Sequence, residues 1–93
     1  MSDLTQDSVL RLAPGCRLSP ADGPEDLLLI PEGALRLKGP ARTIVELCDG
    51  KRTLPELIEE LRRRYLPEDA ARIETEAVTL LARLRDRGVL EKV

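Results

Sequence analysis

The stretch DLLLIPEGALRLK, residues 26–38, decides the fold of this 93-residue chain. An apolar run over residues 27–30 leads into Pro-Glu-Gly, and strict alternation of apolar and polar side chains follows over residues 34–38. Gly33 can enter the left-handed region without a Cβ penalty, which suits the last residue of a three-residue hairpin loop. The stretch therefore predicts an antiparallel β-hairpin.

The alternating strand of this hairpin is expected to have one buried face and one exposed face. Successive side chains of a strand point to opposite faces, so Leu35 and Leu37 are predicted to lie on the core side. Arg36 and Lys38 then face water. Residues 16–19 alternate in the same way before a proline breaks the pattern, so we expect them to form a first strand.

Three helices are predicted after the hairpin, over residues 40–48, 53–65 and 67–87. Gly-Pro ends the ribbon, and proline suits the first position of a helix. The second helix starts at a capping box, in which the side chains of Thr53 and Glu56 each satisfy a free amide. A Leu-Pro step ends that helix, and a glycine stops the third and longest one.

Taken together, these elements predict an α+β fold in which a three-stranded antiparallel sheet is followed by a three-helix bundle. Eighteen leucines beside a single tyrosine, with no Phe or Trp, indicate a leucine-rich core. Ninety-three residues are enough for one small domain. Residues 1–9 are mainly polar and are expected to form a flexible tail, and residues 10–93 the folded domain.

Charge and hydropathy argue against several classes of protein. A net charge of −2, from 15 basic and 17 acidic residues, gives no strong field for nucleic acid. No signal sequence or membrane span is recognisable, so we expect a cytoplasmic protein that does not bind membranes. Cys16 and Cys48 come without any histidine, which is too few ligands for a usual metal site, and we expect both to be free thiols.

No group of residues stands out as catalytic. Without histidine, acid–base catalysis would fall to carboxylates, but these occupy first turns of helices, turns and exposed faces among arginines. Cys48 falls on the apolar stripe of its helix, which favours a small buried side chain over a nucleophile. We therefore predict that the protein is not an enzyme and needs no cofactor.

A run of arginines, Arg62, Arg63 and Arg64, closes the second helix and allows two interpretations. It could contact phosphates in a winged-helix DNA-binding module. It could instead complement the helix dipole and pair with Glu59 and Glu60 along the same helix. The low net charge favours the second interpretation.

The outer edge of the hairpin is the remaining feature with chemical content. The unpaired amides and carbonyls of an edge strand can recruit an extended peptide. If the third helix packs beside the ribbon, its wide apolar face would leave a groove for the side chains of such a peptide. The edge could equally be covered by the chain itself or by a second copy, and both interpretations remain open.

Three motifs carry a resemblance to a known family: LLLIPEGALRLKGPA at residues 27–41, IVELCDGKRT at 44–53 and RGVL at 87–90. In this order they resemble the PqqD family of pyrroloquinoline quinone (PQQ) biosynthesis, over about residues 10–93. The resemblance implies a winged-helix-like, non-catalytic peptide chaperone. Such a module recognises the leader of a ribosomally made precursor peptide and presents it to a radical S-adenosylmethionine maturase. One departure is at residues 38–40, where relatives often place asparagine before the helix.

The resemblance also implies where the peptide binds. In the family, the leader adds as a strand beside the third strand and lies against the third helix. A homodimer built on the same edge, with exchange of segments at hinges such as Gly23-Pro24 or Gly39-Pro40, is compatible with this site. The candidate peptide-binding residues are Ala34, Leu35, Arg36, Leu37, Lys38, Ile73, Ala77, Leu80, Leu81 and Leu84.

Overall fold

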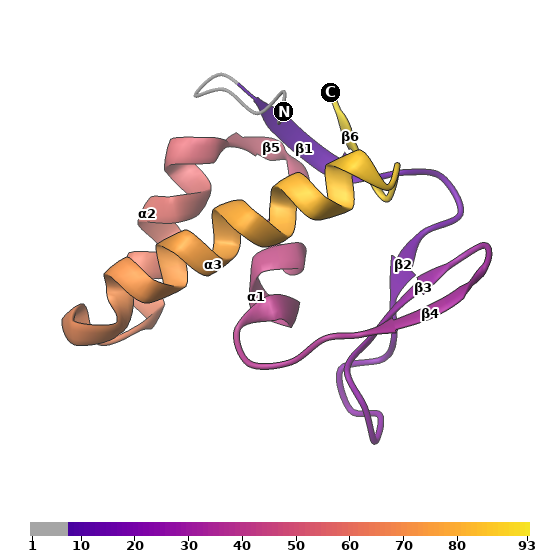
Figure 1. The fold of residues 1–93 in the computed structure, drawn as a ribbon, viewed down its shortest axis with the longest axis horizontal. Coiled ribbons are helices and arrows are strands. Elements are labelled where there is room, and N and C mark those ends of the chain that lie inside the picture. Colours follow the sequence, from indigo (N-terminus) through magenta and orange to yellow (C-terminus); the bar gives the residue numbers. More distant parts are fainter. Residues whose placement is uncertain (1–7) are drawn as a thin grey trace.

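The structure is a computed structural model that describes residues 8–93. Its strands form two three-stranded antiparallel sheets, one in the order β5-β1-β6 and the other in the order β2-β3-β4. Figure 1 shows the β2-β3-β4 sheet at one end of the molecule, with the helices and the other sheet beyond it. In chain order the elements are β1 (Val9–Leu12), β2 (Arg17–Leu18), β3 (Leu27–Ile30), β4 (Gly33–Arg36), α1 (Ala41–Glu46), β5 (Asp49–Thr53), α2 (Leu54–Arg64), α3 (Pro67–Asp86) and β6 (Leu90–Lys92).

β3 and β4 form the predicted hairpin, and β2 adds the third strand to its sheet. Ile30 pairs directly with Gly33, so the loop contains only Pro31 and Glu32 and is one residue shorter than predicted. Gly33 has a φ of +149°, a conformation that favours glycine, as the sequence suggested. It adopts this conformation as the first residue of β4 rather than as the last residue of the loop.

The β5-β1-β6 sheet was not predicted. Its central strand, β1, begins at Val9, although the polar composition of residues 1–9 predicted a flexible tail; residues 1–7 lie outside the described part of the chain. β5 has the sequence DGKRT and β6 the sequence LEK, and neither shows the apolar alternation typical of a strand. Pairing with β1 therefore determines their conformation, and an ion pair of 2.8 Å between Arg11 and Glu91 joins β1 to β6.

α1 and α2 confirm the helices predicted after the hairpin, with small shifts at their ends. Pro40 is the N-cap of α1 and not its first helical residue. The capping box of α2 is present: the hydroxyl of Thr53 accepts from the amide of Glu56 at 3.4 Å, and the carboxylate of Glu56 accepts from the amide of Thr53 at 2.8 Å. These two bonds satisfy amides that the first turn of a helix leaves free.

α3 ends at the predicted glycine. Gly88 has a φ of +77°, and its amide donates to the carbonyl of Arg85 at 3.1 Å. The amide of Val89 donates to the carbonyl of Leu84 at 2.9 Å, which completes a Schellman motif. The side chains of Val89 and Leu84 are both buried, so this motif turns the chain back into the core and into β6.

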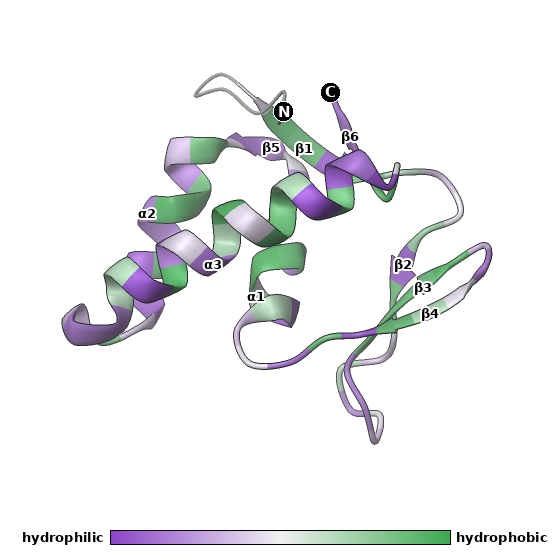
Figure 2. Ribbon diagram, in the orientation of Figure 1, coloured by the Kyte–Doolittle hydropathy of each residue, from purple (hydrophilic) through white to green (hydrophobic). Residues whose placement is uncertain are grey.

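One aliphatic core joins all parts of the molecule, and it confirms the α+β fold class and the leucine-rich interior. Figure 2 shows β3 coloured largely as hydrophobic, in contrast to the hydrophilic β6. None of the helices in residues 8–93 is long and apolar enough to cross a bilayer. The largest fully buried side chains come from β3, all three helices and β6: Leu28, Ile44, Val45, Leu61, Leu81 and Leu90.

Candidate functional site

β4 is an edge strand, and one hydrogen bond shows which of its main-chain groups face outward. Within the described residues its only strand partner is β3. The amide of Leu37 donates to the carbonyl of Asp26 at 2.9 Å, just beyond the β3–β4 ladder. Because paired and unpaired positions alternate in an antiparallel ladder, Leu35 also faces β3, whereas Ala34 and Arg36 direct their amides and carbonyls away from it.

The two faces of this strand agree with the sequence prediction. Leu35 and Leu37 are half-buried and pack against the core. Arg36 and Lys38 are exposed, and the nearest carboxylate oxygen of Glu25 lies 3.4 Å from the guanidinium of Arg36. At this distance and exposure the ion pair contributes little to stability. The edge therefore combines open main-chain groups with a solvated outer face.

A pocket of about 120 Å³ lies where the chain leaves β4 and turns into α1. It reaches from the hairpin across α1 to one side of α3, which packs against α1. Among the predicted site residues, Lys38 and Leu80 are brought together here. The other members were missed because their role depends on how α1 turns back onto α3. The lining residues are Lys38, Pro40, Ala41, Ile44, Glu76 and Leu80.

The remaining predicted residues of α3 belong to the core. The four have 0–3% of their surface exposed, so a peptide could not reach them while the core is closed. From the sequence, the apolar stripe of α3 looks wider than the core requires. The β5-β1-β6 sheet, which the sequence did not predict, accounts for this width because its strand β6 packs against α3. Only Leu80 of the predicted α3 residues is half-buried at the edge of that stripe; the four in the core are Ile73, Ala77, Leu81 and Leu84.

The arginines at the end of α2 are engaged with carboxylates of the same chain. A guanidinium nitrogen of Arg62 lies 2.8 Å from a carboxylate oxygen of Glu74 on α3. Arg63 and Arg64 approach Glu60 at 3.7 and 3.5 Å. This supports the ion-pairing interpretation of the sequence, with Glu60 as expected but with Glu74 of α3, and not Glu59, as the second partner. The DNA-binding interpretation finds no support in this arrangement.

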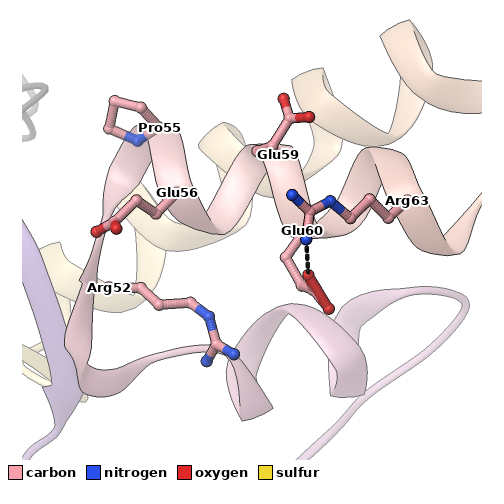
Figure 3. A pocket seen from close by; sticks show the side chains of 6 residues that line it. All are labelled: Arg52, Pro55, Glu56, Glu59, Glu60 and Arg63. Atoms are coloured by element: carbon pink, nitrogen blue, oxygen red, sulfur yellow. Dashed lines mark ion pairs between the residues drawn. The ribbon is translucent and has the colours of Figure 1, made fainter.

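A larger hollow, of about 550 Å³, lies on the outer side of α2. Figure 3 shows its side chains, with Arg63 reaching back to Glu60. Pro55 is the only lining residue without a charge, so the apolar surface of the hollow comes from Pro55 and from the aliphatic parts of the charged side chains. Its charged members are Arg52, Glu56, Glu59, Glu60 and Arg63.

Cys48 is buried, in agreement with the sequence prediction. Its thiol lies 3.5 Å from the carbonyl of Ile44, one helical turn earlier. Burial, with a smaller contribution from the carboxylate of Asp49, raises the pKa of Cys48 from 9.0 to about 12. The side chain is therefore a protonated thiol at neutral pH and not a nucleophile.

The fold of this chain is similar to part of a larger enzyme of known structure. The heterocyclase TruD superposes on 92% of this chain with a TM-score of 0.64 and 23% sequence identity. The matched region is only 12% of the heterocyclase chain. At this level of identity the likeness concerns the fold alone.

Sequence comparison extends the likeness to proteins of the same size. A PqqA binding protein of Methylococcus capsulatus is 31% identical over 97% of this chain and 95% of its own length. A PqqA binding protein of Xanthomonas oryzae pv. oryzae is 35% identical over 97% of this chain and 98% of its own length. The profile of coenzyme PQQ synthesis protein D matches residues 25–90. The chain therefore belongs to the PqqD family, the family of coenzyme PQQ synthesis protein D.

Proposed function

We propose that this chain is a peptide chaperone of PQQ biosynthesis, which binds the PQQ precursor peptide, PqqA, as an added strand on β4. The observation that carries this proposal is the outward direction of the amides and carbonyls of Ala34 and Arg36 beside the pocket that contains Leu80. The family and the names of its relatives support the choice of peptide.

The geometry of β4 specifies how such a peptide would bind. An extended segment beside β4 would exchange main-chain hydrogen bonds with Ala34 and Arg36. Its side chains would alternate between solvent and the protein, so that one of them could enter the pocket between Ile44 and Leu80. About 120 Å³ is well below the volume of a small-molecule site, which suits the pocket to one side chain of a longer ligand.

This function needs no bond-making by the chain itself. The bound leader would be presented to a radical S-adenosylmethionine maturase, and the proposal assigns the chemistry to that enzyme. We place this step in the cytoplasm, where the free thiols of Cys16 and Cys48 would stay reduced. The binding residues of the proposal are Ala34 and Arg36 for the main chain, with Lys38 and Leu80 at the pocket.

Titration of the isotope-labelled protein with synthetic PqqA peptide, followed by nuclear magnetic resonance, tests the proposal. We expect amide shifts along residues 33–38 and around Leu80, and no such shifts with a scrambled peptide of the same composition. Shifts confined to α2, or no shifts up to about millimolar peptide, the weak end of measurable affinities, would reject it.

The same edge could instead pair with a second copy of this chain. Gly39, with a φ of +57°, lies between β4 and α1 and could act as the hinge for an exchange of segments. Light scattering over a concentration series separates the two occupants. A mass that stays monomeric without peptide favours PqqA as the partner of β4, and a stable dimer favours the second copy.

A further inference from the structure

Arg42, in the first turn of α1, makes contacts that the sequence did not reveal. Its side chain is only 15% exposed. One terminal nitrogen donates to the carbonyl of Ser19 at 2.7 Å, and the other donates to the carboxylate of Asp26 at 3.2 Å. The Nε atom lies 3.4 Å from the carboxylate of Glu46. Both terminal nitrogens thus have charged or polar hydrogen-bond partners, which is how a buried charge is tolerated, whereas within the described residues Nε has only the ion pair with Glu46 and no hydrogen bond.

The carbonyl of Ser19 is available to Arg42 because of an irregularity at the end of β2. The amide of Ser19 donates to the carbonyl of Leu27 at 2.8 Å, as in an ordinary ladder. The return bond is different: the amide of Leu27 donates to the Ser19 hydroxyl at 2.9 Å and not to its carbonyl. The hydroxyl thus takes the place of the carbonyl in the ladder, and Arg42 binds the carbonyl that is left.

Asp26 extends the reach of Arg42 to the edge strand. Its carboxylate accepts from Arg42, and its main-chain carbonyl accepts from the amide of Leu37 at 2.9 Å. Ser19 follows β2, Asp26 precedes β3 and Leu37 follows β4. The guanidinium therefore ties one end of all three strands of the hairpin sheet to α1.

The shape of the pocket depends on the orientation of the hairpin sheet relative to α1. Lys38 contributes to the pocket from the end of β4, whereas Ile44 and Leu80 contribute from the helices. Figure 1 shows the chain crossing from β4 to α1 as a thin connection, which includes Gly39 in the left-handed conformation. A rotation about the segment between β4 and α1 would separate β4 from the helical side of the pocket.

We propose that Arg42 is a positioning residue, which fixes the hairpin sheet against α1 so that β4 and the pocket can engage one peptide together; its effect on affinity rests on the proposed function. Arginine suits this role because its planar guanidinium donates in two directions at once, to Ser19 and to Asp26. A lysine ammonium would lack this fixed fork.

The test uses the variants Arg42→Gln and Asp26→Asn, with Arg11→Gln as the matched control. The Arg11→Gln variant also loses a close ion pair, the one with Glu91 at 2.8 Å, but this pair lies in the β5-β1-β6 sheet. Residual dipolar couplings report the orientation of the hairpin sheet relative to α3, and calorimetry gives the affinity for synthetic PqqA peptide. If the competent orientation falls to about a tenth of the population, the apparent affinity falls about tenfold.

We expect both Arg42→Gln and Asp26→Asn to change the relative couplings and to weaken binding, and Arg11→Gln to do neither. Unchanged couplings in both variants, or affinities equal to that of Arg11→Gln, would overturn the proposal. If the unaltered protein binds no PqqA peptide, the proposed function fails. The couplings of the free variants still decide whether Arg42 sets the orientation of the sheet.

Discussion

The amide of Leu37 and the carbonyl of Asp26 are joined at 2.9 Å, and this bond determines which side of β4 is open. The bond shows that the amides and carbonyls of Leu35 and Leu37 point toward β3. Those of Ala34 and Arg36 therefore point toward the free edge. A shift of one residue would exchange these roles and would turn the apolar side chains to solvent. The open main-chain groups and the buried face of the hairpin are thus set by the same register.

Arg36→Pro tests the open amide directly. Proline removes one donor at the free edge and leaves the β3–β4 ladder intact, because an edge strand tolerates proline where its N–H faces out. We expect the variant to fold and to bind PqqA peptide at least about fivefold more weakly, in line with the loss of about one net hydrogen bond. Isothermal titration calorimetry measures the loss.

Two substitutions control for the side chain and for the ladder. Arg36→Ala keeps the amide and loses only an exposed ion pair with Glu25, so its affinity is expected to stay close to that of the unaltered protein. Leu35→Pro removes a donor inside the ladder and is expected to unfold the hairpin. Equal affinities of Arg36→Pro and Arg36→Ala would contradict main-chain pairing at this position.

Leu80→Ala tests the pocket. Leu80 is the half-buried side chain of α3 in the pocket lining, and its loss removes apolar contact with an inserted peptide side chain. We expect binding about tenfold weaker, on the scale of one partly buried aliphatic side chain. Val78→Ala is the control, since Val78 is 41% exposed and does not line this pocket. Similar losses in both variants would argue against the pocket.

Leu28→Ala tests the shared core. Leu28 is completely buried, and it links the hairpin sheet to the cluster formed by the helices. We expect the free energy of unfolding to fall by about 2–5 kcal/mol, as for other fully buried leucines. Leu66, 61% exposed, provides the control, because Leu66→Ala is expected to cost less than about 0.5 kcal/mol. Urea denaturation gives both values, and a small loss for Leu28→Ala would mean that the sheet and the helices do not share one core.

The pKa of Cys48 predicts how stability depends on alkaline pH. Its thiol has a pKa of about 12 in the folded chain and 9.0 as its ordinary value. Between these pH values the thiol is deprotonated in the unfolded chain and stays protonated in the folded chain. The contribution of Cys48 to the free energy of unfolding is therefore full below pH 9, and it declines above pH 9 by up to about 1.4 kcal/mol per pH unit.

Cys48→Ala isolates this contribution. The variant is expected to lose the part of the alkaline slope that comes from the thiol, as measured by urea denaturation at several pH values between 8 and about 11, a range set by the ordinary and raised pKa values. Identical slopes for the variant and the unaltered protein would show that Cys48 is not buried in the folded chain.

The sequence predicted the elements whose patterns are local. The hairpin of β3 and β4 has strong alternation, and α2 has a capping box and a proline at its start, so each could be located from its own residues. β5 and β6 could not be located in this way. Their few polar residues become strands because β1 lies between them, and pairing of distant segments is not visible in a single short run.

The candidate site was predictable on its strand side and less so on its helix side. Alternation alone gave the faces of Leu35 and Arg36. The α3 residue that can line the pocket depends on how much of the apolar stripe of α3 is buried by the second sheet and by α2. Ala77 is fully buried, whereas Leu80 remains in the pocket lining. The role of Arg42 depends on a hydroxyl of Ser19 replacing a carbonyl, a detail that only the folded chain shows.

Hydrogen exchange of the β4 amides with and without PqqA peptide tests the central claim most directly. In the free protein, the amides of Ala34 and Arg36 are predicted to exchange quickly and those of Leu35 and Leu37 slowly. When the peptide binds, the exchange rates of the Ala34 and Arg36 amides should fall by at least about tenfold, because these residues gain main-chain partners. If they keep their fast exchange while the peptide is bound, PqqA does not add to β4 as a strand.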